Sequence, residues 1–239
     1  MYVGIKICVP IPAADFNTLP NMISEAEEEG ADLIEIRLDY MGREIVNQLN
    51  SLRNIVSQCS TPLIATNRHP SQGGRCALSE GERIKTLIKA AEAGFEYVDV
   101  ELCVANIRRV VDGVRAHGAK IVISHHDFSH TPQISDLERI VSEQIGAGAD
   151  ICKVVTMAND VMDSIRALVF TYEVSRKVDL VCFAMGEKGL LSRILSPVFG
   201  AAFTYASLSK GLETAPGQIT INEIREIYRR MKLDNEGDR

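Results

Sequence analysis

The sequence predicts an α/β fold: a single (β/α)8 TIM barrel covering residues 1–239. Short apolar runs alternate with helix-like stretches from end to end. Nearly all of the runs are apolar throughout, as expected of parallel strands covered on both faces. The length of 239 residues suits a barrel, because such domains often run to about 200–250 residues. An open doubly wound sheet is the competing architecture, but no Gly-x-Gly-x-x-Gly or Walker-type loop follows any run, which disfavours its nucleotide-binding versions.

Eight strands are expected, most of them followed by a helix. The strands are Ile5–Val9, Leu33–Arg37, Leu63–Thr66, Tyr97–Glu101, Lys120–Ser124, Ile151–Val155, Leu180–Met185 and Ala202–Ala206. The helices are Asn21–Glu29, Glu44–Gln58, Ser79–Ala93, Val104–His117, Ile134–Ala147, Asp160–Lys177 and Asn222–Met231.

Glycines and capping residues set the helix ends. A glycine typical of a left-handed C-cap stands between a helix and the next strand at Gly30, Gly94, Gly118 and Gly148. Two helices begin with the spacing of a capping box, Ser79 with Glu82 and Ser135 with Glu138. The charged residues 234–239 are expected to fray.

Composition and charge exclude several classes of protein. With 46% hydrophobic and 24% charged residues, the chain has ordinary globular composition. A net charge of −6 argues against a nucleic-acid partner. No apolar run is long enough to span a membrane, and the N-terminus does not resemble a signal peptide. We therefore expect a cytoplasmic protein. The six cysteines form no Cys-x-x-Cys pair, and we expect buried free thiols.

Lys153 is the sharpest single feature. It lies inside an apolar strand and shares a face with Ile151 and Val155. Burial favours the neutral amine, and a neutral amine can attack a ketone to form a Schiff base. The alternative is a lysine paired with a carboxylate in a barrel layer. Lys6, in the similar run of the first strand, shows that the pattern alone is not decisive.

Other polar residues follow neighbouring strands, at the barrel end where chemistry gathers. His126 is a candidate proton carrier. We expect no metal, because adjacent His125 and His126 should point apart in an extended strand. Arg37, Arg68 and Arg193 suggest an anionic substrate. Ordinary salt bridges, for instance of Arg37 with Asp39 or Glu35, are the alternative.

Several segments together resemble type I 3-dehydroquinate dehydratase of the shikimate pathway. They occur in family order over nearly the whole chain: Glu35-Ile36-Arg37, Ser124-His125-His126-Asp127-Phe128, Lys153, Met185-Gly186-x-x-Gly189-x-x-Ser192-Arg193 and Ala215-Pro216-Gly217-Gln218. The combination is specific, although each piece alone is not.

The resemblance implies a cytoplasmic hydro-lyase, typically a homodimer, that needs no cofactor or metal and dehydrates 3-dehydroquinate. Lys153 would form the Schiff base, and His126 would be the general acid/base. The residues that would bind the substrate are Glu35, Arg37, Arg68, Arg193, Thr214, Gln218 and Met185. The last of these would line the pocket.

The chain departs from the family pattern at Gln72, where a glutamate commonly orients the histidine. A glutamine can accept a hydrogen bond but carries no charge. We therefore hypothesise that Asp99 or Glu101 supplies the negative charge near His126. Thr214 replaces the usual serine and keeps its hydroxyl. The loop 69–75, with its two glycines, is the expected lid.

Two other functions remain open at the sequence level. A class I aldolase-like barrel enzyme would share the fold and the lysine, but would need a phosphate cradle of glycine-rich backbone. A non-catalytic barrel that binds a sugar acid would need no reactive amine at all. Covalent trapping of a ketone on Lys153 would distinguish the dehydratase from the binding protein.

Overall fold

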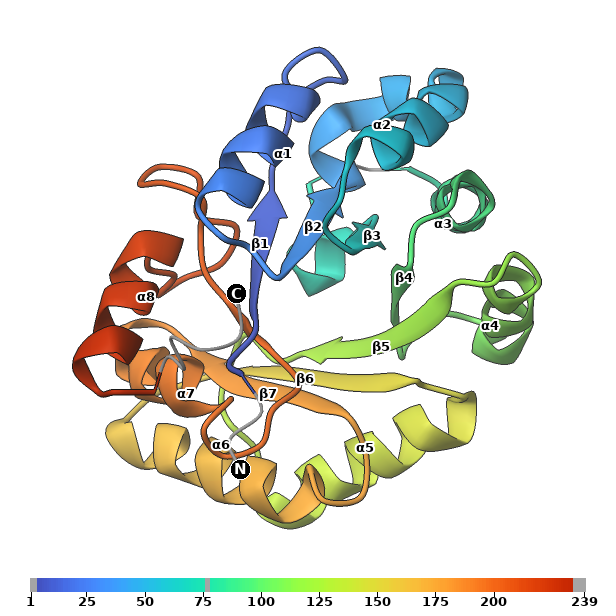
Figure 1. The fold of residues 1–239 in the computed structure, drawn as a ribbon. Helices are drawn as coiled ribbons and strands as arrows, with labels where there is room; N and C mark the ends of the chain where they lie inside the picture. The colour runs from blue at the N-terminus through green and yellow to red at the C-terminus, as the bar shows by residue number, and fades with distance from the viewer. Residues whose placement is uncertain (1–3, 76–77, 234–239) are drawn as a thin grey trace.

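Eight parallel strands curve into a nearly closed barrel with helices outside it (Figure 1). The computed structural model describes residues 4–75 and 78–233. The strand order is β7-β6-β5-β4-β3-β2-β1-β8. Between the two end strands, the N–H of Ala202 donates to the carbonyl oxygen of Leu180 at 2.8 Å. The predicted (β/α)8 barrel is therefore confirmed.

The structure sets the element bounds. The strands are β1 Ile7–Ile11, β2 Leu33–Arg37, β3 Leu63–Thr66, β4 Tyr97–Glu101, β5 Lys120–His126, β6 Ile151–Met157, β7 Leu180–Met185 and β8 Thr204–Tyr205. The α-helices are α1 Leu19–Glu28, α2 Leu52–Gln58, α3 Glu80–Ala93, α4 Ile107–Arg115, α5 Ile134–Ala147, α6 Val161–Val174, α7 Leu190–Leu195 and α8 Ile221–Arg230. Short 3-10 segments are η1 Leu38–Asn47, η2 Leu49–Ser51, η3 Pro70–Gln72 and η4 Glu187–Gly189.

The inside of the barrel changes character along its axis. Apolar side chains near the N-terminal ends of the strands form one buried cluster that includes Leu33, Ile64, Val122, Ile151, Val181 and Phe203. Two residues further along each strand the side chains face inward again. Those positions hold Glu35, Thr66, Ser124, Lys153, Phe183 and Tyr205, all buried. The barrel is thus apolar at one end and mostly polar at the end where the strands finish.

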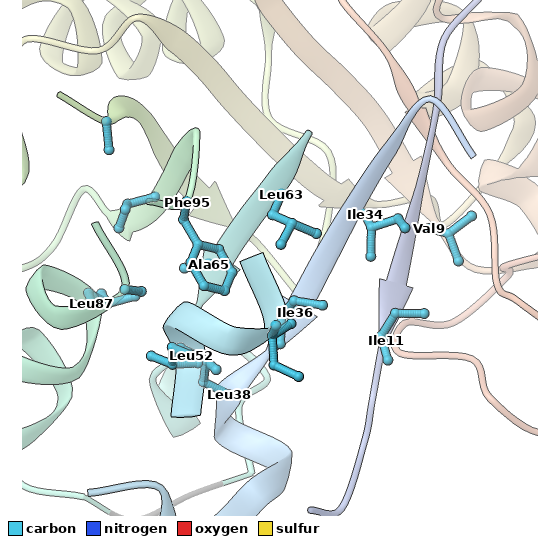
Figure 2. Close-up of a cluster of buried hydrophobic side chains, with 14 of the residues drawn as sticks. Val9, Ile11, Ile34, Ile36, Leu38, Leu52, Leu63, Ala65, Leu87 and Phe95 are labelled. Carbon is cyan, nitrogen blue, oxygen red and sulfur yellow. The ribbon is translucent and has the colours of Figure 1, made fainter. Parts of the chain in front are cut away.

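The outer faces of the strands pack against the helices. Figure 2 shows part of this layer, where Ile36 of β2 lies on the side of Leu52 of α2 and Ile34 lies further along the same strand. These three side chains are fully buried. Burying an aliphatic side chain stabilises the fold by about 1.5–3 kcal/mol. This shell fixes the strands, and the strands in turn fix the polar groups at their ends.

The predicted left-handed glycines are confirmed, because Gly30, Gly94, Gly118 and Gly148 all have positive φ. Ser79 forms its capping box with Glu82. The helices predicted at 104–117 and 160–177 are shorter, at Ile107–Arg115 and Val161–Val174. The capping box of Ser135 with Glu138 is wrong, because α5 already begins at Ile134, after Gln133.

The strand predictions err mainly at their ends. β1 lies two residues later than predicted, β8 is shorter, and β5 and β6 run on through His126 and Met157. The stretch 44–58 was predicted as one helix, but it contains two 3-10 segments before α2. Helix α7 was not predicted. Short strands and helices carry too few residues for periodicity to fix their ends.

The cysteine prediction is correct only in part. Cys8, Cys152 and Cys182 are buried free thiols, but Cys103 is exposed and Cys59 is partly so. Cys76 and the predicted frayed tail 234–239 lie outside the described residues. Within residues 4–75 and 78–233, no helix has the length and apolar character that a membrane crossing requires.

Candidate active site

The C-terminal ends of the strands surround a cavity of about 500 Å³. Every residue that the sequence predicted for the site lines it: Glu35, Arg37, Arg68, His126, Lys153, Met185, Arg193, Thr214 and Gln218. Asp99 and Glu101 are the two candidates for the negative charge near His126. Both lie buried at the end of β4. A concave site with several convergent polar groups suits a small molecule.

Lys153 projects from β6 into the barrel, with only 5% of its side chain exposed. Its Nζ lies 2.8 Å from the hydroxyl of Tyr205 and 3.0 Å from Oδ2 of Asp99. Oε1 of Glu35 is 3.4 Å away. The lysine is therefore paired with carboxylates, as the second alternative expected, and it also lines the cavity, so the Schiff-base role stays a prediction.

Asp99 is the centre of the polar network. Its carboxylate accepts two hydrogen bonds from Arg68, at 2.8 and 2.7 Å, and one from Ser124 at 2.5 Å. Burial raises the pKa of Asp99, but Arg68 and Lys153 more than reverse this effect and hold it well below the usual range. Asp99 is therefore an anion at neutral pH, and it can offset the charge of a protonated Lys153.

Arg68 serves this network as well as the cavity. Burial lowers the pKa of Arg68, but the carboxylates of Asp99 and Glu101 raise it above its usual value. Nη1 of Arg68 also lies 3.1 Å from Glu101. A second buried arginine, Arg83 of α3, contacts the other carboxylate oxygen of Glu101 at 2.6 Å. A helix outside the barrel thereby steadies the charges inside it.

His126 lies at the end of β5 and faces the cavity. Burial lowers the pKa of His126 well below its ordinary value, and the charges of Arg68 and Lys153 lower it further, while Asp99 opposes them. No hydrogen-bond partner of its buried Nδ1 is found in the described part of the chain. The imidazole is therefore neutral near pH 7 and able to accept a proton.

Gln72 contacts the backbone of His126 rather than its ring. The N–H of His126 donates to Oε1 of Gln72 at 2.8 Å. Strand β4 pairs with β5 only as far as Glu101 opposite Ser124, so the glutamine side chain takes the place of a missing strand partner. The charge hypothesis thus applies to Asp99, which acts on His126 through space, and not to Glu101, which binds the two arginines.

The loop that carries Gln72 needs its glycines. A Cβ at Gly74 would lie 1.8 Å from the carbonyl oxygen of Arg68, and one at Gly73 would lie 2.6 Å from the ring of Phe128. Gly73 also has a φ of +84°, which favours glycine. This close packing brings Gln72 and Gly73 to the cavity wall.

Arg193 is a buried cation that makes few hydrogen bonds to the described part of the protein. Its residue exposure is 1%, and within the described chain Nε and Nη1 have no hydrogen-bond partner. Nη2 donates to the carbonyl oxygen of Pro216 at 3.2 Å. Burial lowers the pKa of Arg193 to about 9, so the group is still cationic at neutral pH. A buried guanidinium with free donors is suited to bind a carboxylate.

The loop after β8 brings Thr214 and Gln218 to the same side of the cavity. Oε1 of Gln218 accepts from the N–H of Thr214 at 2.7 Å, which fixes the loop. A glycine is required at position 217, because a Cβ added to Gly217 would lie 2.4 Å from the carbonyl oxygen of Gly186. The N–H of Gly186 in turn donates to Pro216 at 3.2 Å.

Arg37 lines the cavity but is also held by the protein. Its Nε and Nη2 bind Asp39 at 2.9 and 2.8 Å. The salt bridge that the sequence offered as an alternative is therefore present, and it leaves Nη1 for a ligand. Met185, at the end of β7, is 1% exposed and contributes an apolar wall.

Phe183 and Tyr205 are among the cavity residues that were not predicted. Phe183 of β7 lies under Arg193, whose Cζ is 4.4 Å from the ring centroid. Tyr205 of β8 contacts Lys153. Strict alternation from Met185 and Phe203 would have placed both side chains inside the barrel. In the described residues, no cluster of His, Cys, Asp and Glu could hold a metal ion.

The fold and this site together define a (β/α)8-barrel enzyme with a pocket for a small anionic molecule. The chain belongs to the type I 3-dehydroquinase family, whose model matches residues 7–235. A 3-dehydroquinate dehydratase of Dehalococcoides mccartyi is 39% identical over 217 residues, which are 91% of this chain and 94% of that protein.

Solved structures agree with this membership. The crystal structure of 3-dehydroquinate dehydratase from Geobacillus kaustophilus has a TM-score of 0.86 and 28% identity, and the match covers 98% of this chain and 93% of that one. The type I enzyme from Clostridium difficile, crystallised with covalently modified comenic acid, has a TM-score of 0.85 and 25% identity, with 95% and 92% covered. A protein described as an aldolase, at 12% identity and a TM-score of 0.58, shares the fold alone.

Proposed function

We propose that the protein dehydrates 3-dehydroquinate to 3-dehydroshikimate through a Schiff base on Lys153. The observation that carries the proposal is the presence of two buried groups in one cavity, the amine of Lys153 on β6 and the partly unpaired guanidinium of Arg193. The substrate has a ketone for the first group and a carboxylate for the second. Family membership supports the same reaction.

The first half of the reaction forms the imine. The amine of Lys153 adds to the C3 carbonyl carbon, the carbonyl oxygen leaves as water, and a protonated imine results. Asp99 and Glu35, both within 3.4 Å of Nζ, stabilise the positive charge at this nitrogen. Arg193 with the loop of Thr214 and Gln218 orients the substrate carboxylate, and Arg37 and Arg68 bind ring hydroxyls.

The second half uses His126. The neutral imidazole removes the C2 proton, and the electron pair moves into an enamine. The pair then expels the C1 hydroxyl, which leaves as water with the proton from His126. Hydrolysis of the product imine restores the free amine. The low pKa of His126 supports the role of base, because the ring arrives unprotonated.

The same geometry disfavours the aldolase alternative. A phosphate cradle needs backbone N–H groups that point at the ligand. In the loop after β7, the N–H of Gly186 donates to Pro216 and that of Gly189 donates to Gly186. The anion site is built instead from a side chain, Arg193. A carboxylate fits such a site as a bidentate partner.

A turnover assay tests the proposal. The protein is mixed with 3-dehydroquinate, and the conjugated enone of the product is followed by its ultraviolet absorbance. We expect catalytic turnover without added metal or cofactor. Substrate that binds but is never consumed would support the sugar-acid-binding protein instead.

We also propose a homodimer. Helix α6 exposes an apolar stripe at helical spacing, Val161, Ile165, Val169 and Tyr172, beside Met162. Exposed apolar faces of this kind mark interfaces. Sedimentation equilibrium should give twice the mass of the 26.3 kDa chain. Arg substitution at Ile165 and Val169 together should yield the monomer, and a wild-type protein that sediments as a monomer would contradict the proposal.

The proposed compartment is the cytoplasm. Cys8, Cys152 and Cys182 are free thiols inside the barrel wall, which suits a reducing environment. Fractionation of cells that express the tagged protein tests this, and recovery outside the cytoplasm would refute it.

A further inference from the structure

Tyr205 lies directly beside the amine of Lys153. Its hydroxyl is 2.8 Å from Nζ, and Nζ lies 4.3 Å from the centroid of its ring. The residue is 4% exposed and lines the cavity. Phe183 and Phe203 hold its ring, with centroids 6.1 and 5.6 Å away. The hydroxyl is thus held beside the amine at the wall of the cavity that a substrate would fill.

Among the groups that the described residues bring to Nζ, the phenol is chemically distinct. The other two are the carboxylates of Glu35 and Asp99, and an ionised carboxylate can only accept a hydrogen bond. Oε1 of Glu35 is also bound by Thr66 at 2.6 Å. A phenol can accept one proton and donate another.

We propose that Tyr205 is a catalytic residue of imine formation, whose hydroxyl relays a proton from Nζ of Lys153 to the carbonyl oxygen of the substrate. The inference rests on the proposed function, because it concerns the same amine and the same ketone. It adds a third catalytic group to Lys153 and His126.

The relay balances in two stages. When the amine adds to the carbonyl carbon, an N–C bond forms and the carbonyl π pair moves to oxygen, so nitrogen becomes positive and oxygen negative. Tyr205 accepts a proton from nitrogen and donates its own to oxygen, which gives a neutral carbinolamine. The carbinolamine nitrogen then carries one hydrogen, and the protonated imine must keep it.

The second stage therefore takes its proton from solvent, not from nitrogen. The carbinolamine oxygen receives that proton through the Tyr205 hydroxyl, the C–O bond breaks, and the nitrogen lone pair forms the protonated imine. Tyr205 ends as it began, as a neutral phenol. Burial raises the pKa of Tyr205 well above its ordinary value, and Glu35 raises it further, so the phenol keeps its proton between turnovers.

The test compares two variants that each lose one hydroxyl. Tyr205→Phe keeps the ring between Phe183 and Phe203 and removes only the relay. Tyr97→Phe is the matched control, because Tyr97 lies at the opposite end of the barrel, where it lines a separate cavity. Each protein is mixed with 3-dehydroquinate, quenched with borohydride after milliseconds, and the adduct on the Lys153 peptide is quantified by mass.

We expect Tyr205→Phe to slow imine formation by about 10²-fold, as for the loss of a positioned proton donor, with KM within about twofold of wild type. Tyr97→Phe should react at the wild-type rate. Wild-type trapping by Tyr205→Phe would overturn the inference while leaving the proposed function intact. No adduct in the unaltered protein would overturn both.

A second measurement does not depend on any variant folding. Imine formation by the unaltered protein should be slower in D2O than in H2O by about twofold or more, because protons are in transfer. Equal rates in the two solvents would overturn the relay.

Discussion

The two ends of the barrel interior obey the same alternation but are stabilised differently. Near the N-terminal ends of the strands, Leu33, Val122 and Phe203 need only packing. Two residues later, Glu35, Ser124 and Lys153 are equally buried but polar, and each needs a hydrogen-bond partner. Burial of apolar side chains at the first end stabilises the fold. The polar side chains of the second end can be buried only because their charges are paired.

Residues outside the barrel strands also take part in pairing these buried polar groups. Arg83 reaches Glu101 from helix α3, and a loop glutamine holds the backbone of His126. Arg193 is the exception, because its charge is incompletely partnered by the described protein. The comparison indicates that the polar end is organised around a ligand, while the apolar end is complete by itself.

The largest expected effect comes from removing the amine. Lys153→Met keeps the length of the side chain and should lower turnover by at least about 10³-fold, as for the loss of a nucleophile, and abolish the borohydride adduct. Lys6→Met is the control, since Lys6 is an exposed lysine at the other end of the barrel. Turnover of Lys153→Met near the wild-type rate would refute the Schiff base.

Breaking the outer support should mainly cost stability. Arg83→Ala leaves Glu101 with one fewer buried partner, and removing one member of a buried pair costs about 3–5 kcal/mol. Urea unfolding measures the loss. Arg43→Ala, which removes an arginine with 72% of its side chain exposed, is the control and should change little. Equal losses in both variants would contradict the importance of the buried network.

Removing the incompletely paired cation should act on binding rather than on stability. Arg193→Ala should lower kcat/KM by about 2–5 kcal/mol in free-energy terms, if the carboxylate meets it in a desolvated pocket. Steady-state kinetics measure this, with the exposed Arg139 changed to Ala as a control. Unchanged kcat and KM would remove Arg193 from the substrate site.

A smaller effect should appear in the pH profile. Burial, Arg68, Lys153 and Arg37 lower the pKa of His126, and Asp99 opposes them. Because the base must be unprotonated, kcat/KM should fall only at pH values well below 6.5. Gln72→Glu adds a carboxylate, raises the pKa of His126 and moves this acid limb to higher pH.

Two further variants sharpen this test, one that adds no charge and one that removes a negative charge. Gln72→Ala adds no charge and should leave the limb in place, whereas Asp99→Asn should move it to lower pH. A larger shift in Gln72→Ala than in Asp99→Asn would contradict the account. The same low pKa has a stability consequence: the unfolded chain binds more protons, so the free energy of unfolding due to His126 falls as pH drops below 6.5.

Sequence pattern predicted the barrel and most strand positions, and it singled out Lys153, His126 and three arginines at the strand ends. The resemblance to the family added the remaining predicted cavity residues, Glu35, Met185, Thr214 and Gln218. Neither predicted which partners meet. Asp99, Ser124 and Arg68 come from three strands, and their hydrogen bonds depend on register. Gln72 binds the backbone of His126, and that contact depends on where β4 ends. Tyr205 lies inside the predicted strand Ala202–Ala206, but strand pattern does not show that its hydroxyl meets Lys153.

The most direct test of the central claim is the mass of the protein after reaction with 3-dehydroquinate and borohydride, followed by peptide mapping. The account predicts one reduced adduct per chain, on the peptide that contains Lys153. Consumption of substrate with no adduct, or an adduct on any other lysine, would contradict it.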